Sequence, residues 1–193
     1  MRSASSTDQG SMVATRKKLR EARFFYDLLV SAEGQIMKQQ GDEASDFYLS
    51  AFLTAARSVF WVLEVEEKKR FRPWYRQWKK HLTPAEQSTW VFHVGQRSKS
   101  VHARGAETRA AATSVPVQEL QMELARRGGA AYFFGGAVGA EPPTTTRTSL
   151  KFPTRTTIDV ATSCRTFLDL VSKLVGDFEQ HLSGEVRTAS AQL

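Results

Sequence analysis

Apolar residues recur every three or four positions in four long segments of the chain. These segments span residues 15–40, 42–67, 84–105 and 159–181. Such spacing places the apolar side chains on one stripe of a helix, and that stripe is buried against a neighbour. A further short helix is expected over residues 68–82. The pattern therefore predicts a mainly α fold, a bundle of four to five helices.

The start of the third long helix carries a local signal. Thr83 precedes Pro84, and Glu86 follows three positions after Thr83. A Thr at the cap and a Glu three residues later satisfy each other's backbone N–H groups, and proline suits the first helical position. We therefore expect this helix to begin at Pro84 and to end near Gly105.

The helical period fades over residues 106–158, where Gly, Thr, Pro and Ala dominate. Residues 130–138 and 149–158 resemble two strands around a Pro-Pro-Thr-Thr-Thr loop. Residues 115–124 fit either a short helix or an alternating strand. The sequence thus predicts a small β-hairpin insert between the third and last long helices.

The length of 193 residues suits one domain. We expect this domain over residues 15–182, with a disordered tail or cloning remnant at 1–14 and a flexible tail at 183–193. No signal peptide and no membrane span are expected, because no apolar run approaches about 20 residues. The single cysteine, Cys164, lies on an apolar stripe and is expected to be packed there. A single cysteine cannot form an internal disulfide, so a reducing cytoplasm is the simplest expected location.

The net charge of +7 has one local source. Residues 68–81 contain seven of the 27 Lys and Arg residues and no acid, and the remaining twenty balance the twenty Asp and Glu residues. Interleaved aromatics suggest a stacking platform for single-stranded nucleic acid. However, positions 71, 74, 75, 78 and 82 also form one helical face. We therefore expect the aromatics in the core and a basic strip outside that contacts phosphates.

Several familiar chemical signatures are missing. The sequence has no Gly-rich loop ending in Lys-Ser/Thr, no Gly-x-Ser-x-Gly, no His-Glu-x-x-His and no carboxylate cluster with metal-ligand spacing. We therefore predict neither a metal nor a cofactor.

An Arg and a His near the end of the third long helix are the main chemical candidates. Arg97 can place two hydrogen bonds on a phosphate, and His102 can move a proton near neutral pH. Their five-residue step corresponds to about 140° around a regular helix, so the two side chains diverge. They can converge only where the last turn opens or across a symmetric partner.

The order of these features resembles the HEPN family of helical bundles, which carry an Arg-x4-6-His motif. The resemblance spans residues 20–182. The matching segments are EARFFYDLL (21–29), FYLSAFLTAARSVFWVLE (47–64), RPWYRQW (72–78), RSKSVH (97–102), the AYFF strand and the last helix.

The resemblance implies a homodimeric, metal-independent endoribonuclease of the toxin–antitoxin or defence type. His102 would exchange protons at the ribose 2′-OH or the leaving oxygen, and Arg97 would hold the phosphate. Ser98 stands where the family commonly has a polar residue, often Asn. RNA, an antitoxin or a nucleotidyltransferase are the implied partners. The candidate substrate-binding residues are Lys99, Arg104, Arg72, Arg76, Lys79 and His93.

Two other interpretations stay open. In a non-catalytic interaction or scaffold module, His102 would cap the helix end, and Arg97 would pair with Glu21 or Asp27. Alternatively, residues 68–81 would bind an anionic membrane surface.

Overall fold

The computed structural model describes residues 12–35, 43–102, 108–116, 119, 122, 144–152 and 155–190. Within this part the helices are α1 (Val13–Gln35), α2 (Glu43–Glu66), α3 (Lys68–Lys80), α4 (Pro84–His102) and α6 (Val160–Ser190). The strands are β1 (Arg109–Pro116), β2 (Thr144–Phe152) and β3 (Arg155–Asp159). The prediction of a mainly α bundle is confirmed.

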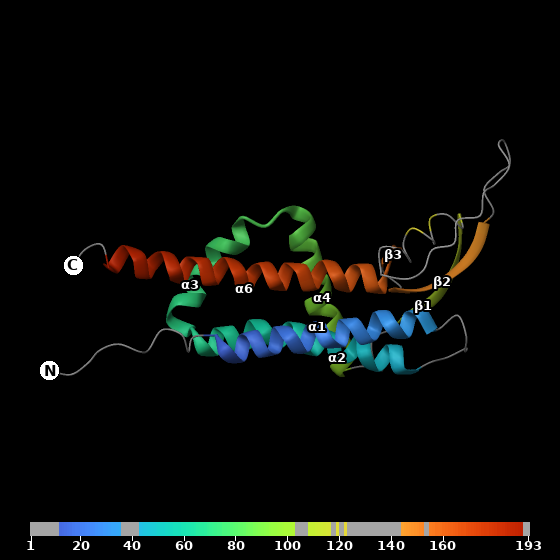
Figure 1. Ribbon diagram of the computed structural model, residues 1–193, viewed down its shortest axis with the longest axis horizontal. Coiled ribbons are helices and arrows are strands. Elements are labelled where there is room, and N and C mark those ends of the chain that lie inside the picture. Colours follow the sequence, from blue (N-terminus) through green and yellow to red (C-terminus); the bar gives the residue numbers. More distant parts are fainter. Residues whose placement is uncertain are drawn as a thin grey trace.

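The three longest helices, α1, α2 and α6, lie lengthwise beside one another, and α4 crosses them (Figure 1). α3 leads from the end of α2 to the outer side of α6. The small sheet lies beyond the end of the bundle where α6 begins. α4 therefore contacts both α2 and α6, and its residues can line a site between them.

The core is built from the apolar stripes that the sequence predicts. α2 and α6 contribute the longest stripes, and a buried side chain of this size stabilises the fold by about 1.5–3 kcal/mol. The fully buried residues of these two helices include Phe52, Leu53, Val59, Leu63, Cys164, Phe167, Leu174 and Phe178. The expected packing of Cys164 is confirmed.

The bundle begins earlier in the chain than expected. Met12 is 1% exposed, and α1 starts at Val13, although residues 1–14 were expected to form a tail. The carboxylate of Glu66 at the end of α2 accepts hydrogen bonds from the backbone N–H groups of Ala14 and Thr15, both at 2.9 Å. This long-range cap has no signature in the sequence near Thr15. Residues 1–11 lie outside the described part.

α2 contains the stretch Ala44–Glu66, which is long and apolar enough to cross a membrane by length and composition. No such stretch was expected from the sequence. In the structure Phe52 and Leu63 face the bundle core, whereas Phe47, Trp61 and Val65 are more than half exposed. A core helix of a bundle gives the same signal as a membrane-spanning one, so this feature carries no further argument.

The corner between α3 and α4 has the expected cap. The Thr83 N–H donates to Glu86 Oε2 at 2.8 Å, and the Glu86 N–H donates to Thr83 Oγ1 at 3.2 Å. Lys173 of α6 donates to the other carboxylate oxygen, Oε1, at 2.6 Å. The capping box therefore fixes the start of α4 and also ties this corner to α6.

The sheet lies in the predicted part of the chain but uses different strands. β2 pairs with β1 and with β3, all antiparallel. Residues 149–158 were expected to be one strand. The structure instead has two strands, β2 ending at Phe152 and β3 beginning at Arg155, and these two residues pair with each other. The sequence has Pro153 between them, and proline lacks the N–H that a continuous strand needs. The expected strand at 130–138 lies outside the described residues.

Two further strand boundaries differ from the expectation. Thr144 to Thr146, assigned to a loop, begin β2, which suits their β-branched side chains. The alanine-rich β1 was not predicted, except for an ambiguous assignment from Val115 onward, because alanine has little strand preference of its own. Pairing with β2 overrides this local preference.

α6 is helical to Ser190 rather than ending near His181, so the expected tail is partly helical. The apolar stripe ends at Leu182, which is why the sequence pattern placed the helix end there. Polar contacts one turn apart continue the helix, including His181 Nε2 to Glu185 Oε1 at 3.3 Å.

Candidate functional site

The aromatic residues of α3 belong to the core, as expected. Phe71 and Trp78 are buried, and Trp74 and Tyr75 pack against the core from its edge. The Trp78 Nε1–H donates to the Asp177 carboxylate at 2.8 Å, which satisfies the only polar group of a buried indole. These rings are therefore not an open stacking platform along α3.

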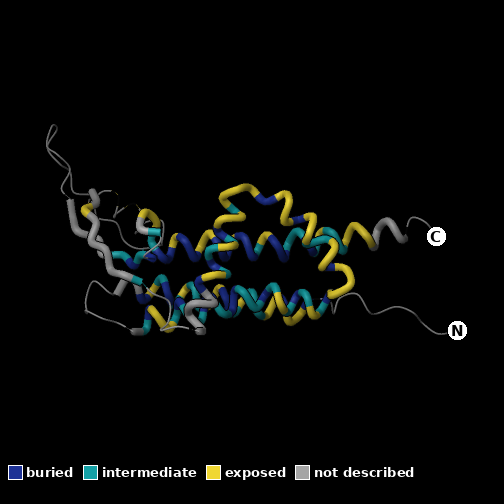
Figure 2. Tube along the Cα trace, turned by 180° about the vertical axis from the view of Figure 1, so that it is seen from behind, coloured by how far each residue is buried: buried dark blue, intermediate teal, exposed yellow. Residues whose placement is uncertain are grey.

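The opposite face of α3 is the expected basic strip. Arg72, Arg76 and Lys79 are exposed, and Figure 2 shows exposed residues along α3 and the corner after it. Arg72 Nε contacts Glu64 Oε1 of α2 at 2.6 Å, so its charge is partly compensated. Lys79 Nζ lies 5.9 Å from the centre of the Tyr75 ring. The strip can thus present cations to phosphates without using stacked bases.

The backbone of α4 stays α-helical through Arg97, Ser98, Lys99 and His102. The side chains of residues 97–102 lie outside the described part, and so does Arg104. An unopened helix keeps positions 97 and 102 about 140° apart around the axis. The backbone is thus regular as far as His102, while residues 103–105 of the expected last turn lie outside the described part.

The positions on α4 form two adjacent stripes. Positions 91, 95, 98 and 102 follow one another at spacings of four, three and four, while positions 90, 94 and 97 form the next stripe. On the first stripe, Val91 is 71% exposed and Gly95 has open space around it. On the second, Trp90 and Val94 are partly buried. Positions 98 and 102 share the helical stripe of Val91 and Gly95, and position 97 shares that of Trp90 and Val94, although the side chains at 97, 98 and 102 lie outside the described part.

His93 does not lie on this surface. Its side chain is 0% exposed, its Nε2 is 3.1 Å from Ser163 Oγ, and its ring stacks on Phe167. Burial, and then the nearby charge of Arg155, lower the pKa of His93 to about 3. The assignment of His93 to substrate binding is therefore wrong for this conformation, because the ring is neutral and enclosed.

In the non-catalytic interpretation, Arg97 would pair with Glu21 or Asp27. Of these two acids, Glu21 already has another partner. Glu21 Oε2 accepts from Lys18 Nζ at 2.7 Å on the same helix. Any contact of Arg97 with Glu21 or Asp27 would involve a side chain outside the described residues.

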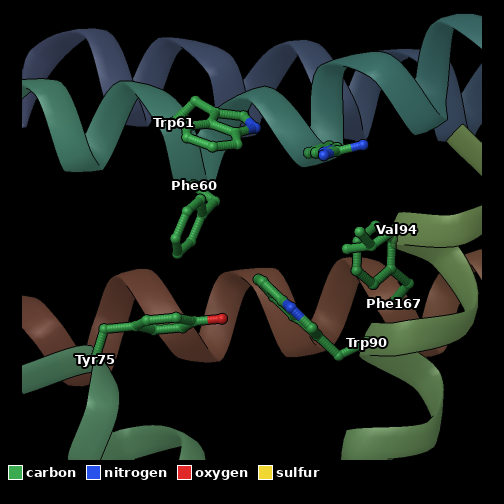
Figure 3. A pocket seen from close by; sticks show the side chains of 7 residues that line it. Phe60, Trp61, Tyr75, Trp90, Val94 and Phe167 are labelled. Carbon is green, nitrogen blue, oxygen red and sulfur yellow. The ribbon is translucent and has the colours of Figure 1, made fainter. Parts of the chain in front are cut away.

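A pocket of about 100 Å³ lies between α2, α3, α4 and α6. It is lined mostly by aromatic rings, with a single charged residue, and its lining residues are Arg57, Phe60, Trp61, Tyr75, Trp90, Val94 and Phe167. In Figure 3, Tyr75 directs its hydroxyl group toward Trp90, and Phe60 descends from α2 toward the space between them. The pocket therefore borders both the basic strip, through Tyr75, and the second stripe of α4.

The Tyr75 hydroxyl stays protonated over the physiological range. Burial, and then the nearby negative charge of Glu64, raise its pKa to about 12. A neutral phenol is both a donor and an acceptor of hydrogen bonds. It is thus a polar group suited to orienting a ligand in an otherwise apolar pocket.

This pocket was not predicted from the sequence. Phe60 lies on the predicted apolar stripe of α2, whereas Trp61 lies beside it and is 51% exposed. A tryptophan off the buried stripe was the available signal, but its partners Tyr75 and Trp90 come from separate helices. Among the described residues, no three His, Cys, Asp or Glu side chains come together as a metal site requires.

Comparisons with known proteins give no assignment: no family model matches the chain, and no curated protein or solved structure is significantly similar to it.

Proposed function

We propose that this protein is a HEPN-like, RNA-directed bundle that acts as a metal-independent endoribonuclease in a homodimer. Arg97 and His102 are its catalytic residues, and Ser98 is a polar neighbour in the same cleft. The observation that carries the proposal is the helical backbone of α4 through His102, a position on the same stripe as the exposed Val91 and Gly95. The basic strip on α3 supports an anionic substrate.

The reaction proceeds without a metal by attack of the ribose 2′-oxygen on the adjacent phosphorus. One His102 removes the 2′-OH proton as the new O–P bond forms. The bond from phosphorus to the 5′-oxygen breaks, and this oxygen takes a proton from a second imidazole. Arg97 binds the non-bridging oxygens, where negative charge increases. The products are a 2′,3′-cyclic phosphate and a free 5′-OH.

The need for two imidazoles explains the dimer. Each chain contributes one His102, and helical geometry turns Arg97 of the same chain away from it by about 140°. A two-fold axis between this exposed stripe of Val91 and Gly95 and the neighbouring stripe of Trp90 and Val94 would bring position 102 of one chain toward position 97 of the other. An exposed valine followed by a glycine allows two helices to approach closely.

The test is cleavage of a single-stranded RNA in excess EDTA, with analysis of the product ends. The proposal expects 2′,3′-cyclic phosphate ends and a loss of at least about a hundredfold for His102→Ala. His81→Ala is the matched control, because His81 is an exposed histidine at the end of α3.

Equal cleavage by the parent and His102→Ala would overturn the assignment of His102. An intact dimer that leaves RNA uncut would instead support the non-catalytic interaction module. Val91→Glu, placed on the exposed stripe, is expected to abolish both dimer and cleavage while the chain stays folded.

A further inference from the structure

The aromatic pocket is more than a gap in the core. Five of its seven lining side chains are aromatic, and they come from α2, α3, α4 and α6. Trp61 is half exposed and Trp90 partly buried, so the rings border solvent on one side. Such a setting suits a flat, weakly polar ring that arrives from solution and packs against these rings.

The rings already contact one another in a tilted arrangement that surrounds the space. Phe60 lies 4.8 Å from Tyr75 and 6.1 Å from Trp90, and Tyr75 lies 6.2 Å from Trp90, measured between ring centres. Their planes differ by 49° to 71°, so they do not stack flat on each other. These three rings therefore pack against one another, and a further ring can reach them only from the open side of the pocket.

The charges around the pocket have both signs. Arg57 is the charged residue among its lining side chains, and Lys79 Nζ lies 5.9 Å from the centre of the Tyr75 ring. The negative charge of Glu64 also acts on Tyr75. An aromatic base matches the rings, and phosphates attached to it match the two cations.

The volume limits the size of the ring. A cavity of about 150 Å³ is known to hold benzene, so this smaller space of about 100 Å³ takes a single six-membered ring only with part of the ring left in the open mouth of the pocket. A two-ring purine would have to displace Trp61 or Phe60. The neutral hydroxyl of Tyr75 can bond the carbonyl group of a pyrimidine.

We infer that this pocket binds one unstacked pyrimidine base of a single-stranded RNA on its open side, against the rings of Phe60, Trp61, Tyr75 and Trp90. The inference rests on the proposed RNA-directed function and adds a base preference to it. Trp90 and Val94 lie on the same α4 stripe as position 97, about two turns and one turn before it. A base held here would place the phosphate on one side of its nucleotide toward the end of α4. The phosphates on the opposite side of the nucleotide would contact the basic strip on α3.

Binding is measured separately from cleavage with 2′-O-methyl hexanucleotides, which lack the attacking hydroxyl group. Calorimetry of the full chain is expected to give at least fivefold tighter binding of hexauridylate than of hexaadenylate. Stacking on an open aromatic surface would give the reverse order, because the larger purine buries more area.

Two variants probe the pocket itself. Trp61→Ala is expected to weaken hexauridylate binding about tenfold, since one stacked base is lost. Tyr75→Phe keeps the ring and is expected to remove the preference for uridine over adenine. Phe24→Ala is the matched control, because Phe24 is an exposed aromatic residue of α1 outside the pocket.

The outcomes separate the pocket from the ribonuclease proposal. A uridine preference that Trp61→Ala abolishes supports the pocket even where RNA is not cut. Cleavage that depends on His102, together with equal binding of both hexanucleotides or an unchanged Trp61→Ala variant, overturns the pocket and leaves the ribonuclease intact. No binding of either hexanucleotide overturns the pocket as well.

Discussion

The imidazole of His93 in α4 stacks on the ring of Phe167 in α6, with ring centres 4.6 Å apart and planes 9° from parallel. The same Phe167 lines the aromatic pocket on its other side. His93 therefore holds the two helices that frame the pocket in a fixed position. It does so as a neutral ring, because burial lowers its pKa to about 3.

This buried histidine predicts a loss of stability in mild acid. In the unfolded chain His93 takes up a proton below its ordinary pKa of 6.5, whereas in the folded chain it does so only near pH 3. The free energy of unfolding should therefore fall by up to about 1.4 kcal/mol per pH unit between these values. Urea unfolding at pH 7, 6 and 5 measures this slope.

His93→Gln removes the titrating group while keeping an amide that can reach Ser163. This variant should be less stable at pH 7 and should lose most of the slope. His81→Gln, at an exposed position, should keep it. An unchanged slope in His93→Gln would show that another group causes the acid sensitivity.

A second pH dependence concerns Glu86 at the start of α4. The ion pair with Lys173, and then the hydrogen bonds from Thr83, lower the pKa of Glu86 to about 2. Because the pKa of Glu86 is lower in the folded chain than in the unfolded chain, its ionised carboxylate stabilises the fold above pH 4.5. This contribution disappears as the pH falls from 4.5 toward 2. Glu86→Gln should therefore be less stable than the parent at pH 7, with a difference that shrinks over this range.

Thermal melts at pH 7, 4 and 3 measure this difference. Asp169→Asn is the control, since its pair with Arg165 lies on the surface and should contribute little at any of these pH values. A difference for Glu86→Gln that stays constant down to pH 3 would contradict the proposed coupling.

The helices were predictable because their signals are local. The stripes of α2 and α6 and the Thr83–Glu86 cap are visible within a few residues of sequence, and each appears in the structure. Features that depend on distant partners were missed. Glu66 caps α1 although it lies about 50 positions later in the sequence. β1 is a strand because it pairs with β2. The pocket is formed by Trp61, Tyr75 and Trp90 from three different helices.

The candidate site divides in the same way. The exposed strip of Arg72, Arg76 and Lys79 followed from helical periodicity, because aromatic residues occupied the other face. His93 was misassigned because its spacing from Arg97 was known, whereas the depth at which α4 packs on α6 was not. Periodicity gives the face of a helix, but only packing decides which polar residue on that face is enclosed.

The long-range cap on α1 gives a third prediction. Burial would raise the pKa of Glu66, but hydrogen bonds from Thr15 and Ala14 outweigh it, and the pKa is lowered. Glu66→Ala leaves the first N–H groups of α1 unpaired and should cost about 1–2 kcal/mol of unfolding free energy. Urea unfolding measures this, with Glu185→Ala near the end of α6 as the control. Equal stability of both variants would contradict the cap.

The basic strip predicts a dependence of RNA binding on salt. Each phosphate contact that is lost should lower the slope of log affinity against log salt by about 0.7 for a single strand. Arg76→Ala and Lys79→Ala should each show this change. Arg72→Ala should show less, because Arg72 already pairs with Glu64 at 2.6 Å. Slopes unaffected by Arg76→Ala and Lys79→Ala would place the RNA elsewhere on the protein.

The proposed dimer predicts how activity falls when two kinds of chain are mixed. Parent and His102→Ala chains are exchanged by mild denaturation and refolded together at a constant total concentration. Where one cleft needs His102 from both chains, only dimers of two parent chains are active, and an equal mixture retains about a quarter of the activity. Where each chain works alone, it retains about half. His81→Ala, mixed in the same way, should leave activity unchanged. A linear decline with the His102→Ala fraction would therefore exclude a shared cleft, even if His102 itself proved essential.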